Sequence, residues 1–232
     1  MNVAIIPARG GSKRIPRKNI KAFCGKPMIA WPLEQARTSG CFNRVIVSTD
    51  DEEVAAVARD YGGEVPFMRP EHLSDDHAGT TEVIAHAIEW LHSQGETPEA
   101  ICCIYATAPF IQAEDLRQGL KRLVENEDVS YVFSVTSYAF PIQRALRLDV
   151  GGRVRMFQPE HFSTRSQDLE EAWHDAGQFY WGRPGAWTKG VPLFSNESLG
   201  LPLPRHRVQD IDTPEDWVQA ELIFKALGET AS

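Results

Sequence analysis

Short apolar runs alternate along the first half of the chain with longer stretches in which apolar residues recur every three or four positions. Runs of the first kind are typical of buried β-strands, and stretches of the second kind predict amphipathic helices. Their regular alternation predicts an α/β fold in three layers: a mainly parallel, Rossmann-like sheet with helices on both faces. The predicted strands are residues 3–6, 44–48, 64–67, 100–105 and 131–135, and the predicted helices are residues 28–39, 52–61, 80–94 and 113–126.

The rhythm changes after residue 136. We interpret residues 137–174 as a small insertion within a single domain that spans residues 1–232. This insertion either covers the functional site as a lid or pairs with another subunit. The elements predicted in this part are a hairpin at 144–156 that turns at 149–152, a polar irregular segment at 159–175, a strand at 177–181, and a helix at 214–227 whose N-cap is Thr213.

Ligands of parallel sheets bind beyond the carboxyl ends of the strands. The loops at 8–19, 49–50 and 106–112 all follow predicted strands and open onto that edge of the sheet. A functional site is therefore expected where these three loops meet.

Composition narrows the class of protein. A chain of 232 residues with 42% hydrophobic content is long enough for one α/β domain with a full core. No apolar run approaches the ~18 residues of a membrane span, and Arg9 interrupts any apolar leader, so we expect no membrane association. The four cysteines lack CxxC spacing, which favours reduced thiols in a cytoplasmic protein. A net charge of −8 argues against nucleic acid as a partner.

Positive charge is nevertheless concentrated at the amino end. Seven of the 24 Lys and Arg residues lie in the first 26 positions, and no Asp or Glu precedes Glu34. The remainder carries 17 cations against 32 acids, which gives it a net charge of −15. Such a distribution predicts an anion-binding site near the first strand.

The loop that follows this strand has the composition of a polyphosphate site. Residues 7–19 read PARGGSKRIPRKN, which matches neither the GxxxxGK[ST] phosphate loop nor the GxGxxG fingerprint. Its glycines let backbone N–H groups approach phosphate oxygens, and its cations add Coulomb attraction. The cations in question are Arg9, Lys13, Arg14 and Lys18.

The segment IPARGGSKRIPRKN at 6–19 resembles the signature of the CMP-sialate synthetase family of cytidylyltransferases. The resemblance covers nearly the whole chain. It implies the fold of nucleotide-diphospho-sugar transferases and the transfer of CMP from CTP to a nine-carbon α-keto acid sugar, with release of pyrophosphate. It also implies a homodimer in which residues 137–174 reach toward the partner's site. Further matching motifs are VSTD at 47–50, RP at 69–70, ATAP at 106–109 and DIDTP at 210–214.

The resemblance also implies roles for individual residues. Arg9 would contact the transferring and leaving phosphates as a catalytic residue, and Lys18 would supply a second catalytic cation. Base recognition maps onto Arg69 and the turn at 77–80. The remaining candidates for CTP binding are Ala8, Gly10, Gly11, Ser12, Lys13, Arg14, Asn19, Gly79 and Thr80.

A triphosphate reaction calls for Mg²⁺, and the expected ligands are Asp210 and Asp212. At i and i+2 of a strand their side chains would share one face. The alternative for Asp212 is that it caps the next helix, although Thr213 already suits that position. Asp50 is a weaker candidate for a metal ligand, and the alternatives for it are to bind the ribose or to cap the helix after it.

The sugar is expected to be less hydroxylated than N-acetylneuraminate. Tyr105 stands where sialate synthetases often have Gln, and Ile111 stands where they have Arg. Residues 140–146 and 174–181 resemble the branch of the family that acts on pseudaminic acid. In that branch Arg144 is our candidate partner for the sugar carboxylate. The other sugar-binding candidates are Tyr105, Thr107, Gln143, Gln178 and Tyr180, where the alternative for residues 179–181 is a core strand.

Several functions remain open on the sequence alone. Legionaminate, N-acetylneuraminate or 3-deoxy-manno-octulosonate could replace pseudaminate as the acceptor. A non-catalytic nucleotide-binding protein is a second class, but it would not need the paired Asp210 and Asp212. A glycosyltransferase is a third class; Asp210-Ile211-Asp212 does spell its DxD motif, and the basic amino-terminal loop argues against it.

Overall fold

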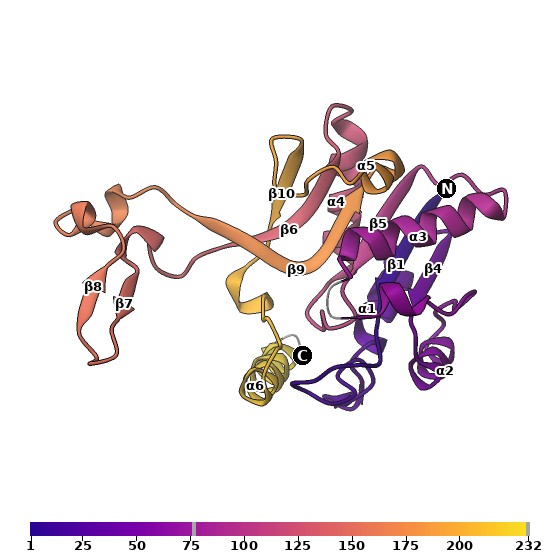
Figure 1. The fold of residues 1–232 in the computed structure, drawn as a ribbon, viewed down its shortest axis with the longest axis horizontal. Coiled ribbons are helices and arrows are strands. Elements are labelled where there is room, and N and C mark those ends of the chain that lie inside the picture. The colour runs from indigo at the N-terminus through magenta and orange to yellow at the C-terminus, as the bar shows by residue number, and fades with distance from the viewer. Residues whose placement is uncertain (76–77, 231–232) are drawn as a thin grey trace.

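The computed structural model describes residues 1–75 and 78–230 and is built around a six-stranded sheet (Figure 1). The strand order is β10-β6-β9-β5-β1-β4, and only β9 runs antiparallel to its neighbours. The α/β architecture with a mainly parallel sheet is therefore confirmed. The strands are β1 (Asn2–Pro7), β4 (Arg44–Ser48), β5 (Ala100–Ile104), β6 (Tyr131–Ser137), β9 (Trp173–Gly182) and β10 (Ser198–Pro202).

Helices cover both faces of this sheet, and alternate residues of β1 point toward the two hydrophobic cores that result. Ala4 and Ile6 face one core, and Val3 and Ile5 face the other. The helices α1 (Ala30–Ser39), α2 (Glu52–Asp60) and α4 (Ala113–Glu125) pack on the first face, whereas α3 (Thr80–Ser93) and α5 (Pro184–Lys189) pack on the second.

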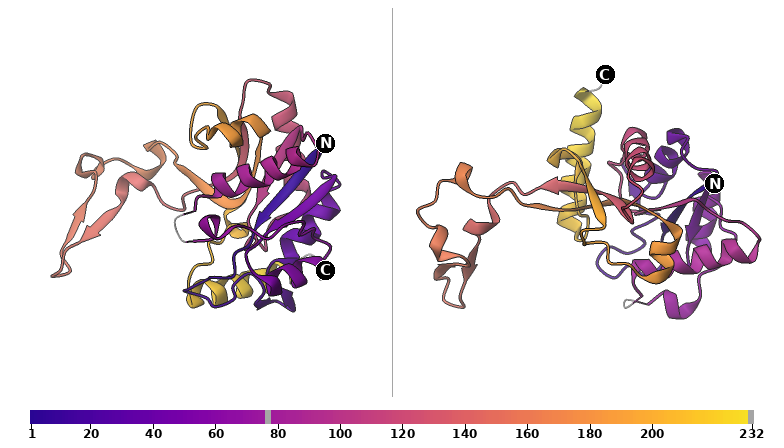
Figure 2. Two further views of the ribbon diagram at one scale, coloured as in Figure 1. Left: turned by 45° about the vertical axis from the view of Figure 1, so that its right-hand side comes forward. Right: turned by 90° about the horizontal axis from the view of Figure 1, so that it is seen from above.

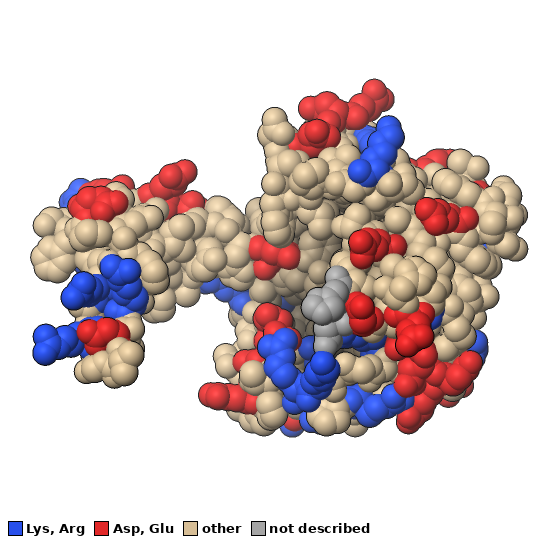
Figure 3. All heavy atoms as spheres, viewed as in Figure 1, with Lys and Arg blue, Asp and Glu red and all other residues tan. Residues whose placement is uncertain are grey.

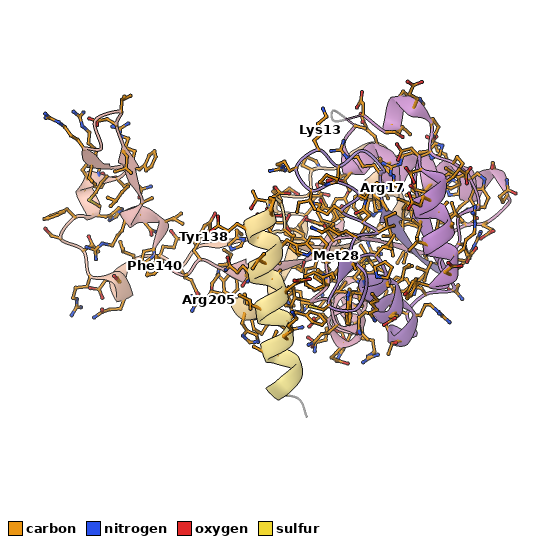
Figure 4. The ribbon with its side chains drawn as sticks, turned by 90° about the horizontal axis from the view of Figure 1, so that it is seen from below. Lys13, Arg17, Met28, Tyr138, Phe140 and Arg205 are labelled. Atoms are coloured by element: carbon orange, nitrogen blue, oxygen red, sulfur yellow. The ribbon has the colours of Figure 1, made fainter. Side chains whose placement is uncertain are left out.

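The last helix, α6 (Pro214–Thr230), belongs to a third cluster outside the sheet. Its Trp217 and Ala220 pack against Ile15, Phe23 and Met28 from the segment after β1. Figure 4 shows Met28 between α6 and the main body. The N-cap prediction is confirmed, because Thr213 Oγ1 accepts a hydrogen bond from the Asp216 N–H at 3.2 Å. This packing brings the end of the chain back to the basic loop.

The predicted strand at 64–67 is wrong. Within this segment Glu64 makes one isolated bridge, to Ile46, and the next bridge, of Thr49 with Met68, lies one residue beyond the segment. Pro66 lies between them and has no N–H to donate to a ladder. The pattern also missed α5 and β10, as well as the small ladder of β2 (Ala22–Phe23) with β3 (Lys26–Pro27).

Residues between β6 and β9 form an arm that projects from the body (Figures 1 and 2). The predicted hairpin is confirmed within it, as β7 (Leu146–Leu148) and β8 (Val154–Met156). Asp149 Oδ1 closes the turn by accepting from the N–H groups of Gly151 and Arg153, both at 2.9 Å. Figure 4 shows Tyr138 and Phe140 at the base of the arm, near Arg205.

No helix in the described part of the chain has both the length and the apolar character that crossing a membrane requires.

Candidate active site

The basic loop leaves β1 at the carboxyl edge of the sheet and is held by backbone and side-chain bonds. Ala8 N–H donates to Ser48 O at 2.9 Å, and Gly10 N–H donates to Asp50 Oδ1 at 3.0 Å. Asn19 Nδ2 donates to Arg9 O at 2.8 Å, and the Ser12 N–H to Gly10 O at 3.0 Å. Of the loop residues predicted to bind CTP, Gly10 and Ser12 therefore use their amides within the protein.

Asp50 does not cap the helix after it, contrary to one of the two expected alternatives, and its Oδ1 instead accepts the bond from Gly10. Its neighbour Asp51 is the N-cap of α2 and accepts from the N–H groups of Glu53 and Val54 at 3.0 and 2.9 Å. Two acids in succession made either residue a plausible cap, and the backbone at 51 has the extended geometry that a cap needs.

Arg17 ties the basic loop to this cap, a role that sequence reasoning missed. It takes a left-handed conformation with φ 55°, and its guanidinium donates to Asp51 Oδ2 and Oδ1 at 2.5 and 2.9 Å. It also pairs with Glu53. The bond from Arg17 holds the pKa of Asp51 at about 2. Gly10 packs against the same carboxyl group: a Cβ there would lie 2.5 Å from Asp51 Oδ2.

Beside the loop lies a cavity of about 510 Å³. Most of the residues predicted to bind CTP meet here. Figure 3 shows Lys and Arg side chains clustered on the lower part of the body, next to its central hollow. The predicted residues that line the cavity are Arg9, Ser12, Lys13, Arg14, Lys18, Asn19, Arg69, Thr80, Tyr105, Thr107 and Asp212.

Arg69 is the most buried cation of this cavity, with 7% of its surface exposed. Its Nη2 donates to Ser48 O at 2.8 Å and its Nη1 to Leu73 O at 3.3 Å, while Nε has no partner among the described residues. Burial lowers the pKa of this guanidinium. A buried cation with a donor to spare suits a ligand that offers acceptor atoms, such as a pyrimidine edge.

The other segment predicted to bind the base, residues 77–80, is described from residue 78 onward, and part of its hydrogen-bonding capacity is used within the protein. His77 lies outside the described residues. Gly79 is the N-cap of α3, and its N–H donates to Glu82 Oε2 at 3.1 Å. Arg9 approaches this segment, because its Nη1 donates to the carbonyl of Asp75 at 3.1 Å. The loop after β1 and the turn before α3 therefore form facing walls of the cavity.

Asp210 and Asp212 lie on a segment that meets the basic loop, but this segment is not a strand. Residues 208–212 form an irregular connection between β10 and α6, because β10 ends at Pro202 and they pair with no other strand. Asp212 lines the main cavity and pairs with Arg14 at 2.8 Å and with Lys18 at 3.3 Å. Lys18 also donates to Ile211 O at 2.7 Å.

Asp210 lines an adjoining cavity of about 380 Å³. Its pKa is raised, first by burial and then by the charge of Asp212, while Lys18 opposes the rise. Two carboxylates that repel each other beside these cavities provide oxygen ligands that fit Mg²⁺. Among the described residues no group of three or more His, Cys, Asp or Glu could hold a metal, so water and phosphate oxygens would complete the coordination.

Tyr105 and Thr107 line both cavities. The other predicted sugar ligands do not. Gln178 is buried in β9 and its Nε2 donates to Arg207 O at 2.5 Å. Tyr180 is 2% exposed and lies behind Tyr105. The core-strand alternative is therefore correct for this part of β9.

Three more residues that were expected to reflect the sugar lie away from the two cavities. Gln143 donates to Glu170 O at 3.0 Å within the arm, and Arg144 donates to Ser166 Oγ at 3.4 Å, also within the arm. Neither lines the main cavity or the adjoining one. Ile111 is 2% exposed in the core that packs against α1 and α4, so it does not report on the ligand.

The second cavity also contains residues to which the sequence assigned no role. His174, Asp175 and Gln209 line it together with the two residues shared with the main cavity. Asp115 and Arg207 form an ion pair at 2.6 Å that is largely buried and ties α4 to the connection before Asp210. The sequence signals for this cavity were the polar residues within 174–178, which interrupt an otherwise apolar strand, and the resemblance noted for residues 174–181.

Residues 3–183 match the cytidylyltransferase family. The chain is 46% identical over 230 residues to pseudaminic acid cytidylyltransferase of Campylobacter jejuni subsp. jejuni serotype O:2, with 99% of each chain covered. It is 30% identical to CMP-N,N'-diacetyllegionaminic acid synthase of Legionella pneumophila, with 96% of each covered. The structure of CMP:2-keto-3-deoxy-manno-octonic acid synthetase complexed with CTP superposes with a TM-score of 0.69 at 18% identity, covering 97% of this chain and 98% of that one. At that identity the likeness supports the fold alone.

Proposed function

The chain belongs to the cytidylyltransferase family, and we propose that it transfers CMP from CTP to the anomeric hydroxyl of a nine-carbon α-keto acid sugar, pseudaminic acid. The observation that carries the nucleotide half of this proposal is the convergence of Arg9, Lys18, Arg69 and Asp212 on one cavity. The sugar half rests on the identity of 46% to a pseudaminic acid cytidylyltransferase over nearly the whole of both chains.

In this reaction the anomeric oxygen bonds to the α-phosphorus, the bond between the α-phosphorus and the bridging oxygen breaks, and pyrophosphate and one proton are released. The enzyme need only position the reactants and neutralise charge. Arg9 and Lys18 would stabilise the charge that develops on the transferring and leaving phosphates. The buried guanidinium of Arg69 would hold the cytosine.

We propose Asp210 and Asp212 as the ligands of Mg²⁺, which when bound supplies further neutralisation of phosphate charge. The ion pairs that Asp212 makes with Arg14 and Lys18 would then be exchanged, because the triphosphate competes for the two cations. The protein provides in advance both the cations that phosphate needs and the carboxylates that a divalent ion needs.

We further propose a homodimer in which the arm covers the partner's site. The arm exposes large apolar side chains that its own chain leaves uncovered, among them Phe140 at 83% and Leu148 at 70%. Arg144 and Gln143 lie on this arm and line neither of the two cavities described above, so we assign them to the cavity of the partner. In that arrangement Arg144 would meet the carboxylate of the sugar.

We also place the reaction in the cytoplasm, where CTP is available. The four cysteines form no disulfide in the described structure, and two of them are buried as small apolar residues.

A substrate panel tests this function. Protein, CTP and Mg²⁺ are incubated separately with pseudaminic acid, legionaminic acid, N-acetylneuraminic acid and 3-deoxy-manno-octulosonic acid, and CMP-sugar formation is followed by mass spectrometry and pyrophosphate release. Fastest turnover with pseudaminic acid supports the proposal, and faster turnover with another acid reassigns the sugar. CTP binding without pyrophosphate release for any acid would identify a non-catalytic binding protein instead.

Lys18 and Lys21, three residues apart, provide a variant and a matched control that test the catalytic role of Lys18. Lys18→Met should lower kcat by about 10²- to 10³-fold, as expected for the loss of one well-aimed charge donor worth ~2.7–4 kcal/mol. Lys21→Met is the control, because Lys21 lies over the Trp217 ring at 4.4 Å and does not line the cavity. Equal activity of the two variants would refute the role given to Lys18.

A further inference from the structure

Tyr105 occupies the boundary between the nucleotide cavity and the second cavity, and it lines both. An amide at this place could donate and accept hydrogen bonds at once, but a tyrosine hydroxyl has a single proton to donate. The direction in which that proton points therefore decides which ligand groups can bind beside it.

The Tyr105 ring rests on Tyr180, with 5.2 Å between the ring centroids. Tyr180 is buried, and its hydroxyl donates to Asp175 Oδ2 at 2.5 Å. The Tyr105 hydroxyl interacts with that of Tyr180 and with that of Thr80. Burial raises the pKa of both phenols, so both keep their protons at neutral pH.

Asp175 reaches Tyr180 only because β9 is bulged. In a regular strand residues five apart are separated by ~16 Å and point to opposite faces. Here the register with β6 shifts between Phe133 and Val135, and Gly177 has φ 61°. The Gly177 N–H donates to Asp175 Oδ1 at 2.8 Å, which leaves Oδ2 for the hydroxyl of Tyr180.

These contacts fix the direction of the chain of hydrogen bonds. A carboxylate only accepts, so the proton of Tyr180 points to Asp175, and the oxygen of Tyr180 can then only accept from Tyr105. With the proton of Tyr105 used in this way, its oxygen offers lone pairs to any further partner. We infer that Tyr105 presents a hydrogen-bond acceptor to the sugar, selecting a donor group such as an acylamino N–H, and that Asp175 is the positioning residue that sets this polarity. The inference rests on the proposed function.

Asp175→Asn tests the polarity with almost no change in shape. The Gly177 N–H needs an acceptor, so the amide oxygen of the variant takes the place of Oδ1 and the amide NH₂ faces Tyr180. The NH₂ group then donates to Tyr180, the Tyr180 proton turns toward Tyr105, and the Tyr105 proton must turn toward Thr80 or the ligand. Asp128→Asn is the matched control, because this exposed carboxylate follows α4 at the opposite edge of the sheet.

The expected result is a rise in KM for the preferred sugar of about 10- to 100-fold in Asp175→Asn, as for a buried donor left without its acceptor. KM for CTP and the melting temperature should stay close to those of the control. Tyr105→Phe should raise KM for the sugar comparably. Adding Asp175→Asn to Tyr105→Phe should then have no further effect, because both changes act through one hydroxyl.

Multiplicative effects in the double variant would overturn the inference, since Asp175 would then act independently of Tyr105. So would a rise in KM for CTP as large as that for the sugar, or unchanged kinetics in Asp175→Asn. If Asp175→Asn does not fold, Tyr180→Phe interrupts the same series of hydrogen bonds. It should also raise KM for the sugar and leave KM for CTP unchanged. Adding it to Tyr105→Phe should have no further effect. A wild-type protein that forms no CMP-sugar would refute the proposed function itself, which is a different outcome from active enzyme with insensitive variants.

Discussion

Gly10→Ala should destabilise the protein, although alanine is ordinarily at least as stable as glycine in a permitted backbone conformation. The added Cβ would lie 2.5 Å from Asp51 Oδ2 and 2.8 Å from Asp51 Cβ, closer than real Cβ atoms approach. Asp51 therefore has to move, and it is both the N-cap of α2 and the partner of Arg17.

The magnitude follows from what Asp51 gives up. Loss of an N-cap costs ~0.5–2 kcal/mol, and overpacking a filled site costs ~1–3 kcal/mol. Together we expect the free energy of unfolding to fall by about 2–4 kcal/mol. In a protein of this size that corresponds to a melting temperature lower by about 5–15 °C.

Gly11→Ala is the matched control, because no described atom lies within 4 Å of a Cβ at Gly11 and the backbone there is not left-handed. Its melting temperature should be unchanged or slightly higher. Thermal unfolding by circular dichroism measures both variants. In an Asp51→Gly background, Gly10→Ala should cost less than ~1 kcal/mol, since the whole side chain that the new Cβ meets is then absent. If Gly10→Ala and Gly11→Ala have the same melting temperature, the packing of the loop on α2 is not as described.

Three further predictions concern charge and assembly. The pKa of Asp51, held at about 2 by Arg17 against 3.8 for a free carboxyl, means that the pair stabilises the fold above about pH 4 and that this stability is lost as the pH falls toward 2. Urea unfolding over that interval should show a loss ~1 kcal/mol larger in the wild type than in Arg17→Met, because the N–H groups of Glu53 and Val54 still lower the pKa of Asp51 in the variant; parallel curves would contradict this. Asp212→Asn should raise the Mg²⁺ concentration for half-maximal turnover at least ~10-fold and weaken Mn²⁺ binding seen by electron paramagnetic resonance; unchanged Mn²⁺ affinity would exclude it as a ligand. Phe140→Ser with Leu148→Ser should convert a dimer into a folded monomer in sedimentation velocity, and a persisting dimer would place the interface elsewhere.

The sequence was sufficient to predict those parts of the fold that are encoded in short runs of neighbouring residues. The apolar runs that became β1, β4, β5 and β6 are buried on both faces, so their composition alone marks them as strands of a covered parallel sheet. The basic loop was visible for the same reason, because consecutive residues carry its glycines and cations. Its position at the carboxyl edge then followed from the direction of β1.

Roles that depend on distant partners could not be read in this way. A polar residue in a strand looks the same whether it faces a ligand or a neighbouring element, and only the packing of β9 between β5 and β6 shows that Gln178 and Tyr180 face inward. Likewise, adjacent Asp50 and Asp51 differ in function because one meets the amide of Gly10 and the other begins a helix.

The sequence by itself determined the layered sheet and the cation-rich loop, because each is encoded by neighbouring residues or by a simple period. Tertiary structure alone decided which polar groups are used within the protein and which remain for a ligand. The bulge that joins Asp175 to Tyr180 shows why: hydrogen-bond geometry is satisfied over a few ångströms in space, and the chain can bring residues to that distance from any separation along its length.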